Sequence, residues 1–382
     1  MIFSNVYFYP QFMRNILFCV SSDVTTDQRV LRHCALLVEQ GFRVHVVARK
    51  KTGSPDLPEL PFSVTRFSMF FQSGPLFYLF FNFRLFFFLL FRSSSVIWSN
   101  DIDTLVPCAL VSKLKKKKLV FDAHELFTEV PELEGASAKK KIWLYVERIF
   151  TPKADMLITV NQSLARQFYQ RYGLKYNVIR NVPLTINLEK KTTKTSVGIP
   201  DDALLCVLQG SGLNKGRGLI ETLQALPMVP NVHLMVIGSG DALEEAKTCC
   251  QSLDLDRRVH FIPRIPYAEM MSYTQIADIG LAYDTHACLN FQLALPNKIF
   301  DYFQAGIAVL CGPQPEIKHL VDQYACGRAM DIVNPEEIAQ QLAYFSSHRE
   351  ELEEYKRRSR QAAHTETWDN EKTKLIELLK TI

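Results

Sequence analysis

The feature that most constrains the fold is an alternation of short aliphatic runs with longer helical stretches, repeated in two successive series along 382 residues. Strands that are separated by helices pair in parallel, and the helices then cover both faces of the sheet. At about 100–200 residues per domain, the chain has room for two such units. We therefore expect an α/β protein of two doubly wound, Rossmann-like domains. The expected strands are 16–20, 44–47, 96–98, 119–121, 156–159 and 177–179 in the first series, and 204–208, 232–237, 259–262, 279–282 and 308–311 in the second.

The stretch between the two series, 188–196, is charged, rich in threonine and without an apolar period. Such a composition is typical of a linker or an exposed turn. We place one domain in residues 1–187 and the other in residues 188–365, followed by a charged amphipathic helix at 366–382. Because open α/β sheets bind ligands beyond the carboxyl ends of their strands, we expect the strand-to-helix loops of both domains to line a shared cleft.

Composition excludes several classes of protein. With 44 Lys and Arg against 40 Asp and Glu, the net charge of +4 is too balanced for a dedicated nucleic-acid binder. The nine cysteines are scattered without a Cys-x-x-Cys pair, so neither a zinc site nor a disulfide scaffold is expected. The first fourteen residues lack the apolar core of a signal peptide, and we expect a cytoplasmic protein.

One segment departs from this balance, because residues 70–92 contain ten of the 26 phenylalanines. The helix expected near 75–91 carries an Asn and Arg84 near its centre, where an arginine costs about 2.5–3.5 kcal/mol in a spanning helix. We therefore expect a helix that lies in the membrane interface, with Arg84 and Arg92 reaching the headgroups. A buried core helix is the alternative. The nearby run 113–118, five lysines in six residues, would add an electrostatic anchor.

The first motif with chemical character is a glycine-rich loop, 209–218, which follows an expected strand and precedes a helix. Glycines let the backbone approach a pyrophosphate, a helix N-terminus attracts negative charge, and cations neutralise it. The spacing is neither that of a Walker A loop nor that of a dinucleotide-binding fingerprint. The candidate anion-binding residues are Gly210, Ser211, Gly212, Lys215 and Arg217.

A second motif lies at 293–306, where Pro296 suits the first position of a helix and a glycine its C-terminal stop. Free backbone amides at 293–295 would then point from the helix start toward an anion, with Lys298 one turn further along. Asp301 on the same helix suits the hydroxyls of a ribose.

A third motif, the block 120–132, holds four carboxylates and one histidine, His124, at the end of an expected strand. The His-Glu-x-x-His zinc motif is excluded, because position 128 is Thr. From the residues alone, a structural hydrogen-bonding role for His124 stays open beside a catalytic one.

Taken in order, these blocks resemble glycosyltransferase family 4, also called group 1, whose members have the GT-B fold of two facing domains. The resemblance extends from about residue 15 to the C-terminus. It implies a retaining, metal-independent enzyme that moves a sugar from a nucleotide donor to an acceptor. The matching segments are 27–30, 120–132, 158–161, 180–183, 209–218, 238–241 and 293–306.

By this resemblance the domain 188–365 binds the nucleotide sugar, and the helix 366–382 crosses back onto the first domain. The implied catalytic residues are His124, Lys215 and Asp301, with Lys215 on the diphosphate and Asp301 on the ribose. No metal or other cofactor is expected. The implied donor-binding residues are Gly210, Ser211, Gly212, Lys215, Arg217, Ile262, Pro263 and Arg264 (the last three on the base), Ala294 and Leu295 (on the phosphates), Lys298 and Asp301; those on the acceptor side are Asp122, His124 and Glu125.

The phenylalanine-rich helix and the lysine run lie in residues 1–187, the half that supplies the acceptor side in this fold. We therefore expect a lipid-linked or membrane-resident acceptor, a peripheral position at the cytoplasmic face of the membrane, and a part in surface polysaccharide assembly. The sequence does not identify the donor sugar, the nucleotide base or the linkage formed.

Two positions depart from the family pattern. Leu293 stands where the family has an acidic residue eight positions before Asp301, and Gly210 stands where an Arg often precedes Lys215. Three alternatives stay open: a catalytically weak, membrane-bound nucleotide-sugar-binding subunit, a GT-B nucleotide-sugar epimerase, and a metal-dependent single-domain transferase built on the Asp-x-Asp at 101–103.

Overall fold

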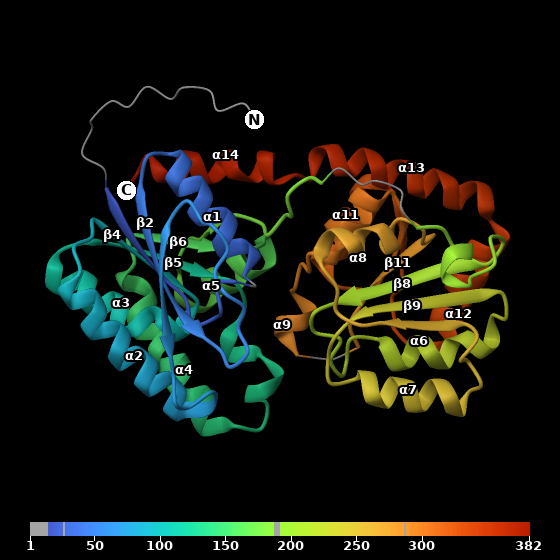
Figure 1. The fold of residues 1–382 in the computed structure, drawn as a ribbon, viewed down its shortest axis with the longest axis horizontal. Coiled ribbons are helices and arrows are strands. Elements are labelled where there is room, and N and C mark those ends of the chain that lie inside the picture. Colours follow the sequence, from blue (N-terminus) through green and yellow to red (C-terminus); the bar gives the residue numbers. More distant parts are fainter. Residues whose placement is uncertain (1–13, 26, 187–191, 286–287) are drawn as a thin grey trace.

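The structure, a computed structural model, describes residues 14–25, 27–186, 192–285 and 288–382 and shows two domains, each built on a parallel sheet (Figure 1). The expectation of two doubly wound α/β units is confirmed. The N-terminal sheet has the order β3-β2-β1-β4-β5-β6-β7 and the C-terminal sheet the order β10-β9-β8-β11-β12-β13. The strands are β1 Asn15–Cys19, β2 Arg43–Lys50, β3 Ser63–Ser68, β4 Val96–Asn100, β5 Lys118–Ala123, β6 Met156–Thr159, β7 Asn177–Val178, β8 Leu204–Gly210, β9 Val232–Gly238, β10 Val259–Ile262, β11 Ile279–Ala282, β12 Ala308–Cys311 and β13 Gly327–Ala329.

Helices cover both faces of each sheet (Figure 1). Those of the N-terminal domain are α1 Gln28–Glu39, α2 Gly74–Phe91, α3 Ile102–Lys115, α4 Ser137–Phe150 and α5 Gln162–Tyr172. Those that follow are α6 Leu219–Ala225, α7 Leu243–Ser252, α8 Tyr267–Thr274, α9 Leu289–Gln292, α10 Lys298–Ala305, α11 Pro315–Tyr324, α12 Pro335–Ser347, α13 Arg349–Thr365 and α14 Trp368–Leu379.

The strand order of each sheet reverses direction once, between β1 and β4 in the first sheet and between β8 and β11 in the second. Loops that leave neighbouring strands diverge at such a switch point and open a crevice at the carboxyl ends of the strands. The topology therefore places one ligand crevice in each domain.

Two edge strands, β3 and β13, were not predicted from the sequence. In β3 (Ser63–Ser68) only two of six residues are apolar; only one of its sides is paired, and its side chains are mostly half-exposed or exposed. The strand β13 has only three residues, Gly327–Ala329, at the other sheet's edge. Neither has the aliphatic run that identifies a buried central strand.

The last helix, α14, packs against the N-terminal sheet although it follows the second domain in sequence (Figure 1). Its apolar residues Trp368, Leu375 and Leu379 join the core cluster that contains residues of β1, β2 and β4. At its start, the Arg180 side chain pairs with Glu371 at 2.7 Å and with Glu366 at 2.6 Å. The C-terminal segment thus ties the two domains together.

The phenylalanine-rich helix α2 is only partly buried. It buries one stripe, Phe77, Phe81, Leu85 and Leu89, against the N-terminal domain. Among the described residues, α2 is the one helix long and apolar enough to cross a membrane. The alternative of a wholly buried core helix is wrong, because most of its other apolar side chains face solvent.

The start of α10 differs from the expectation. The helix begins at Lys298, so Pro296 precedes it instead of taking its first position. The amides of Leu293 and Ala294 donate to Leu289 O at 3.1 Å and to Phe291 O at 3.2 Å, within and just after the short helix α9. They are therefore occupied by backbone bonds in this structure and are not free for an anion.

We predict that Leu375→Ala destabilises the N-terminal domain by about 2–5 kcal/mol, because Leu375 of α14 is fully buried against the N-terminal core and its loss leaves a cavity. All three tryptophans, at 98, 143 and 368, belong to or pack against this domain, so their fluorescence reports its urea unfolding. Thr373→Ala, at an exposed position of the same helix, is the control and should stay within about 0.5 kcal/mol of the parent. Equal stability of the two variants would contradict the packing of α14.

Candidate active site

A cavity of about 1040 Å³ lies between the two domains. Its walls come from the first turns of α1 in one domain and, in the other, from the loops that follow β8 and β10 and the start of α10. This volume lies at the upper end of the range of small-molecule sites, about 300–1,000 Å³. The cleft expected from the strand-to-helix loops is present and has room for a large polar ligand.

Asp301 in the first turn of α10 is 6% exposed, at the cavity wall. One carboxylate oxygen accepts a hydrogen bond from Tyr267 Oη at 2.7 Å, and the other from Gln209 Nε2 at 3.0 Å. Thr274 Oγ1 donates to Gln209 Oε1 at 2.6 Å, which fixes the orientation of that amide. Burial raises the pKa of Asp301 to about 6 in spite of the two donors. The carboxylate is thus held in place and keeps acceptor capacity for ligand hydroxyls.

Two cations border the cavity from the C-terminal domain. Lys298 begins α10, and burial lowers the pKa of its ammonium to about 8, although nearby Asp284 opposes the shift. Arg217 Nη1 donates to both carboxylate oxygens of Asp284 at 3.0 Å, and its guanidinium carbon lies 3.6 Å from the ring centre of Phe291. A lysine at a helix start beside an anchored guanidinium suits an anionic group such as a phosphate.

The side chain of Lys215 does not lie at the cavity, contrary to the expectation from the sequence. Its ammonium pairs with Glu245 at 2.8 Å, and the side chain is 71% exposed. Between Lys215 and Arg217, Gly216 has a φ of 79°, a left-handed conformation that glycine adopts without strain. This turn sends the two cationic side chains in different directions, and Arg217 is the one that reaches the cavity.

The N-terminal wall carries a cation that sequence reasoning missed. Arg32 of α1 is 7% exposed, lines the cavity and donates from Nη2 to Asn181 Oδ1. Burial, and then the charge of Arg29, lower the pKa of Arg32 to about 10, so it stays charged at neutral pH. Its guanidinium also lies 5.7 Å from the ring of Trp368, the first residue of α14. The available signal was the Asp-Gln-Arg sequence that opens α1 beside the first switch point.

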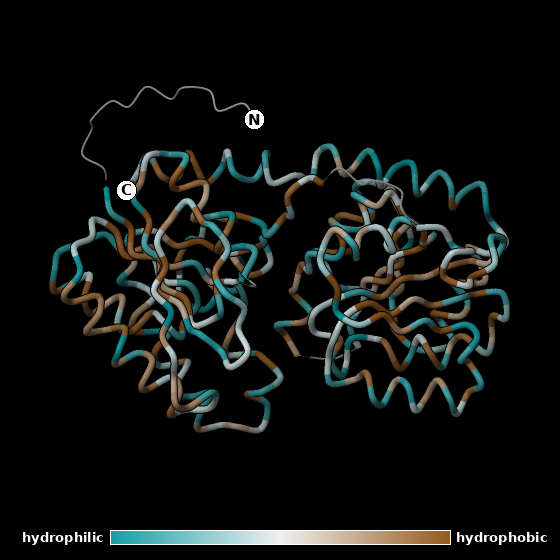
Figure 2. The backbone as a smooth tube through the Cα atoms, in the orientation of Figure 1, coloured by the Kyte–Doolittle hydropathy of each residue, from teal (hydrophilic) through white to brown (hydrophobic). Residues whose placement is uncertain are grey.

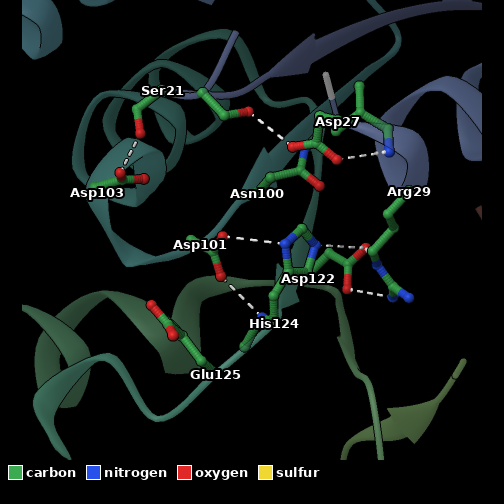
Figure 3. Close-up of polar contacts among 12 residues, drawn as sticks. Ser21, Asp27, Arg29, Asn100, Asp101, Asp103, Asp122, His124 and Glu125 are labelled. Carbon is green, nitrogen blue, oxygen red and sulfur yellow. Dashed lines mark hydrogen bonds and ion pairs between the residues drawn. The ribbon is translucent and has the colours of Figure 1, made fainter. Parts of the chain in front are cut away.

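His124, directly after β5, lies between two carboxylates (Figure 3). Its Nδ1 is 3.1 Å from Asp101 Oδ2, and its Nε2 is 3.4 Å from Asp122 Oδ2. Burial would lower the pKa of His124, but Asp101 and then Asp122 raise it well above its ordinary value. The imidazole is therefore a cation at neutral pH, held from both sides.

Asp122 is fully buried, so the expected contact with an acceptor is not available to it. Its carboxylate accepts from Arg29 Nη2 at 2.8 Å and from Arg29 Nε at 3.2 Å (Figure 3). Burial would raise the pKa of Asp122, but Arg29 and then His124 hold it well below the usual range. Asp122 therefore positions Arg29 and His124 rather than touching a substrate.

Asp101 fixes His124 through a strained backbone. Its φ of 55° and ψ of 167° lie in a region that costs a non-glycine residue about 1–3 kcal/mol. Its Oδ1 accepts the backbone N–H of His124 at 2.8 Å, in addition to the contact with the ring. Strain of this kind concentrates at functional sites, where the surrounding contacts offset it.

The two carboxylates at 101–103 do not converge. Asp103 accepts a hydrogen bond from Ser21, whereas Asp101 faces His124 (Figure 3). Burial, and then Asp101, raise the pKa of Asp103 to about 7. Within the described parts of the chain, no group of three or more His, Cys, Asp or Glu is arranged to hold a metal ion. The Asp-x-Asp alternative therefore gains no support from the geometry.

Glu125 links the histidine segment to the other domain. Asn290 of α9 donates to Glu125 Oε2 at 3.1 Å and accepts the backbone N–H of Leu126 at 2.9 Å. Burial, and then Asp101, raise the pKa of Glu125 to about 7. The amide of Asn290 thus fixes the segment that follows His124.

The contact between α9 and the N-terminal domain also explains why position 293 is a leucine. Leu289 and Leu293 pack against the N-terminal core cluster, and Leu293 O accepts from Asn161 Nδ2 at 2.8 Å. An acidic side chain at position 293 would have to enter this apolar contact. The departure from the family pattern therefore coincides with a contact between the domains.

The structure brings most of the candidate donor-binding residues together, but not all of them. Lys215, Ile262, Pro263, Ala294 and Leu295 lie outside the set that lines the cavity, as do Asp122, His124 and Glu125 on the acceptor side. The candidates that line it are Gly210, Ser211, Gly212, Arg217, Arg264, Lys298 and Asp301.

Two doubly wound domains that face each other across a cleft make up the GT-B fold. Three solved structures are similar over nearly the whole chain, and at their low identities the likeness shows the fold alone. No curated protein matches this chain. The three structures are sucrose-phosphate synthase from Thermosynechococcus elongatus (15% identity, TM-score 0.75, covering 96% of this chain and 98% of that one), a glycosyltransferase from Rickettsia africae (12%, 0.76, 97% and 99%) and HepE of Anabaena in complex with UDP and glucose (16%, 0.75, 97% and 100%).

Family models identify the chain more closely. A model described as Glycosyltransferase Family 4 matches residues 27–190, and one described as Glycosyl transferases group 1 matches residues 190–362. The chain belongs to the family 4, group 1 glycosyltransferases, enzymes that transfer a sugar from a nucleotide-sugar donor. The resemblance drawn from the sequence motifs is confirmed.

We predict that binding of the nucleotide sugar is strongest between about pH 6, the pKa of Asp301, and about pH 8, the pKa of Lys298. Below this window Asp301 gains a proton and loses acceptor capacity, and above it Lys298 loses its charge. Calorimetric titration across pH with a donor selected by thermal-shift screening measures the profile. Lys298→Arg should extend the alkaline limb, since arginine stays charged. Binding that stays constant from well below pH 6 to well above pH 8 would contradict both assignments.

We also predict that Lys298→Ala lowers turnover by about 10²–10³-fold, the scale for losing one preorganised charged donor. Lys215→Ala is the matched control and should have a much smaller effect, because the Lys215 ammonium is exposed and paired with Glu245. Steady-state kinetics at saturating donor compares the two. A larger loss in the Lys215 variant would show that this lysine enters the cleft during the reaction.

Proposed function

We propose that the chain is a retaining, metal-independent glycosyltransferase that acts on a lipid-linked or membrane-resident acceptor at the cytoplasmic face of a membrane, in surface polysaccharide or glycan biosynthesis. The observation that carries the catalytic part is the cleft, where Asp301 lies on the same wall as Lys298 and Arg217. Retention of the anomeric configuration is the property that the family resemblance implies.

The proposed donor pose follows from the charges on the C-terminal wall. The ribose hydroxyls donate to Asp301, whose orientation Tyr267 and Gln209 fix. The diphosphate lies toward Lys298 and Arg217. HepE of Anabaena has been solved with UDP-glucose, and this supports a nucleotide sugar as the ligand of a cleft with this architecture.

The chemistry requires that the negative charge of the leaving group be stabilised. When the bond between sugar and phosphate breaks, negative charge grows on the leaving diphosphate, and fixed cations around it lower the barrier. Lys298 and Arg217 supply that charge without a metal ion. The proposed acceptor approaches from the N-terminal side, where Asp101 and Asp122 hold the protonated His124.

The membrane part rests on one apolar face of the N-terminal domain. In α2, six apolar side chains are 42–80% exposed, and the tube over this helix is largely brown in Figure 2. Leu114 of α3 and Ile142 and Tyr145 of α4 are also more than 60% exposed. Exposed apolar area of this kind marks an interaction site or a membrane contact. The six side chains of α2 are Leu76, Leu79, Phe80, Phe83, Phe87 and Phe91.

The lysine run contributes less to the proposed membrane contact than its five lysines suggest. Lys115 Nζ donates to Leu89 O at 3.3 Å and to Leu90 O at 3.2 Å, so it closes the end of α2. Lys118 pairs with Asp155 at 3.0 Å. The proposed anchor therefore consists of the other three lysines of the run, each worth about 1 kcal/mol near an anionic surface.

A second candidate, a nucleotide-sugar epimerase, is favoured by one comparison. A putative UDP-N-acetylglucosamine 2-epimerase from Listeria monocytogenes has a similar structure, with a TM-score of 0.59 at 8% identity. An epimerase converts its nucleotide sugar without an acceptor. The family models favour a transferase instead, because both describe glycosyltransferases.

We predict that the purified protein, incubated with its donor and a membrane lipid extract, forms a lipid-soluble glycosylated product in the presence of excess chelator. Nuclear magnetic resonance of the product should show the anomeric configuration of the donor. Activity that chelator abolishes and Mg²⁺ restores would refute the metal-independent mechanism. Conversion of the donor without any acceptor would favour the epimerase.

The membrane contact needs its own measurement. Flotation with vesicles of phosphatidylglycerol and phosphatidylcholine should carry the parent protein upward, and Leu79→Glu and Phe91→Glu should reduce this. Both side chains are more than 60% exposed, so neither change disturbs the core. A parent protein that stays with the soluble fraction would remove the membrane part of the proposal and leave the donor chemistry intact.

A further inference from the structure

A groove of about 630 Å³ opens on the outer side of α2. One wall is the connection from β3 to α2, and the other is α2 itself. It lies on the apolar face described above but is a separate, concave feature, within the size range of ligand sites. Five aromatic side chains line it: Phe70, Phe71, Phe80, Phe83 and Phe87.

The aromatic walls are held in place by contacts among the rings. Phe71 stacks on Phe80 with ring centres 5.4 Å apart, and Phe70 meets Phe71 edge-on at 5.2 Å. Phe83 and Phe87 are 4.8 Å apart on successive turns of α2. Offset and edge-to-face pairs of this kind are the preferred aromatic geometries. The groove is therefore formed before a ligand enters it.

The same rings remain open to water. Phe70 is 94% exposed and Phe83 is 63% exposed. A ligand with an apolar chain would remove this surface from water without any rearrangement of the core. A polar or purely anionic ligand would gain nothing from such walls.

The charge around the groove selects for an anion at one end of that chain. Arg84 is exposed at the groove, its guanidinium lies 4.4 Å from the ring centre of Phe67, and Nη1 donates to Ser68 O at 3.1 Å. Between Glu59 and Asp101 the sequence contains no carboxylate, so nothing in this segment repels a phosphate. An arginine anchored by a ring and a carbonyl is a favourable partner for a phosphate group.

We infer that this groove binds the hydrocarbon chain of the lipid-linked acceptor, with the lipid phosphate on Arg84. This inference rests on the proposed function, which supplies the lipid-linked acceptor. It adds the specific site on the protein where that lipid binds. The geometry connects this site to the catalytic side, because Asn82, next to Phe83, donates to Asp103 O at 2.8 Å. Asp103 belongs to the segment that carries Asp101, the partner of His124.

The test uses 1-palmitoyl lysophosphatidic acid as the probe, at concentrations below those at which it forms micelles, in calorimetric titrations of the full-length protein. The parent should bind it, and glycerol 3-phosphate, which lacks the chain, should not bind. Phe83→Ser and Arg84→Ala should each weaken binding by about tenfold or more. The matched controls Leu79→Ser and Phe91→Ser, equally exposed on α2 but outside the groove, should bind as the parent does.

Two results would contradict the inference that the groove binds the lipid chain. Equal losses in all four variants would show a general apolar surface, and unchanged binding in the Phe83 and Arg84 variants would place the probe elsewhere.

Failure of the proposed function would give another pair of results. The groove variants would lose binding of the probe, while sugar transfer would proceed only to water-soluble acceptors. If lipid transfer and vesicle flotation persist but the four variants do not differ, the function stands and the groove fails.

Discussion

The arrangement of the two domains depends on a buried ion cluster at their outer side. Arg180, just after β7, pairs with Glu366 and Glu371, which flank the start of α14 and are 4% and 0% exposed. Burial would lower the pKa of Arg180, but Glu371 and then Glu366 raise it. A buried carboxylate that lost this partner would be strongly destabilising. The cluster therefore joins the end of β7 to the connection between α13 and α14, where the chain passes from the C-terminal domain back to the N-terminal one.

Within that frame each wall of the cleft contributes charge of a different kind. On the C-terminal wall, burial shifts the pKa values of Asp301 and Lys298 toward each other, to about 6 and about 8, so both are charged only in a window around neutrality. On the N-terminal side, His124 is kept protonated by Asp101 and Asp122. The C-terminal wall is thus suited to a diphosphate and a ribose, and the N-terminal domain holds His124 as a fixed cation outside the residues that line the cavity. The contact of Asn290 with Glu125 connects the two.

The two-domain architecture and the central strands could be predicted, because buried parallel strands have aliphatic runs, whereas the edge strands β3 and β13 lack such runs. The sequence also placed Asp301 and Lys298 on the helix that reaches the cleft. It misplaced Lys215, because the direction of a loop side chain depends on left-handed residues such as Gly216 and Gly218, and the lysine pairs with Glu245 outside the cavity. It missed Arg32, which reaches the cleft only through the tertiary packing of α1. The amides of Leu293 and Ala294 were misjudged because the short helix α9 has no periodic pattern long enough to recognise.

The measurement that tests the central claim most directly is a crystal structure of the protein with a nucleoside diphosphate bound. The account predicts the nucleotide in the interdomain cavity, with its ribose hydroxyls within hydrogen-bonding distance of Asp301 and its phosphates beside Lys298 and Arg217. A nucleotide bound outside this cavity, or one whose ribose has no contact with Asp301, would contradict the account.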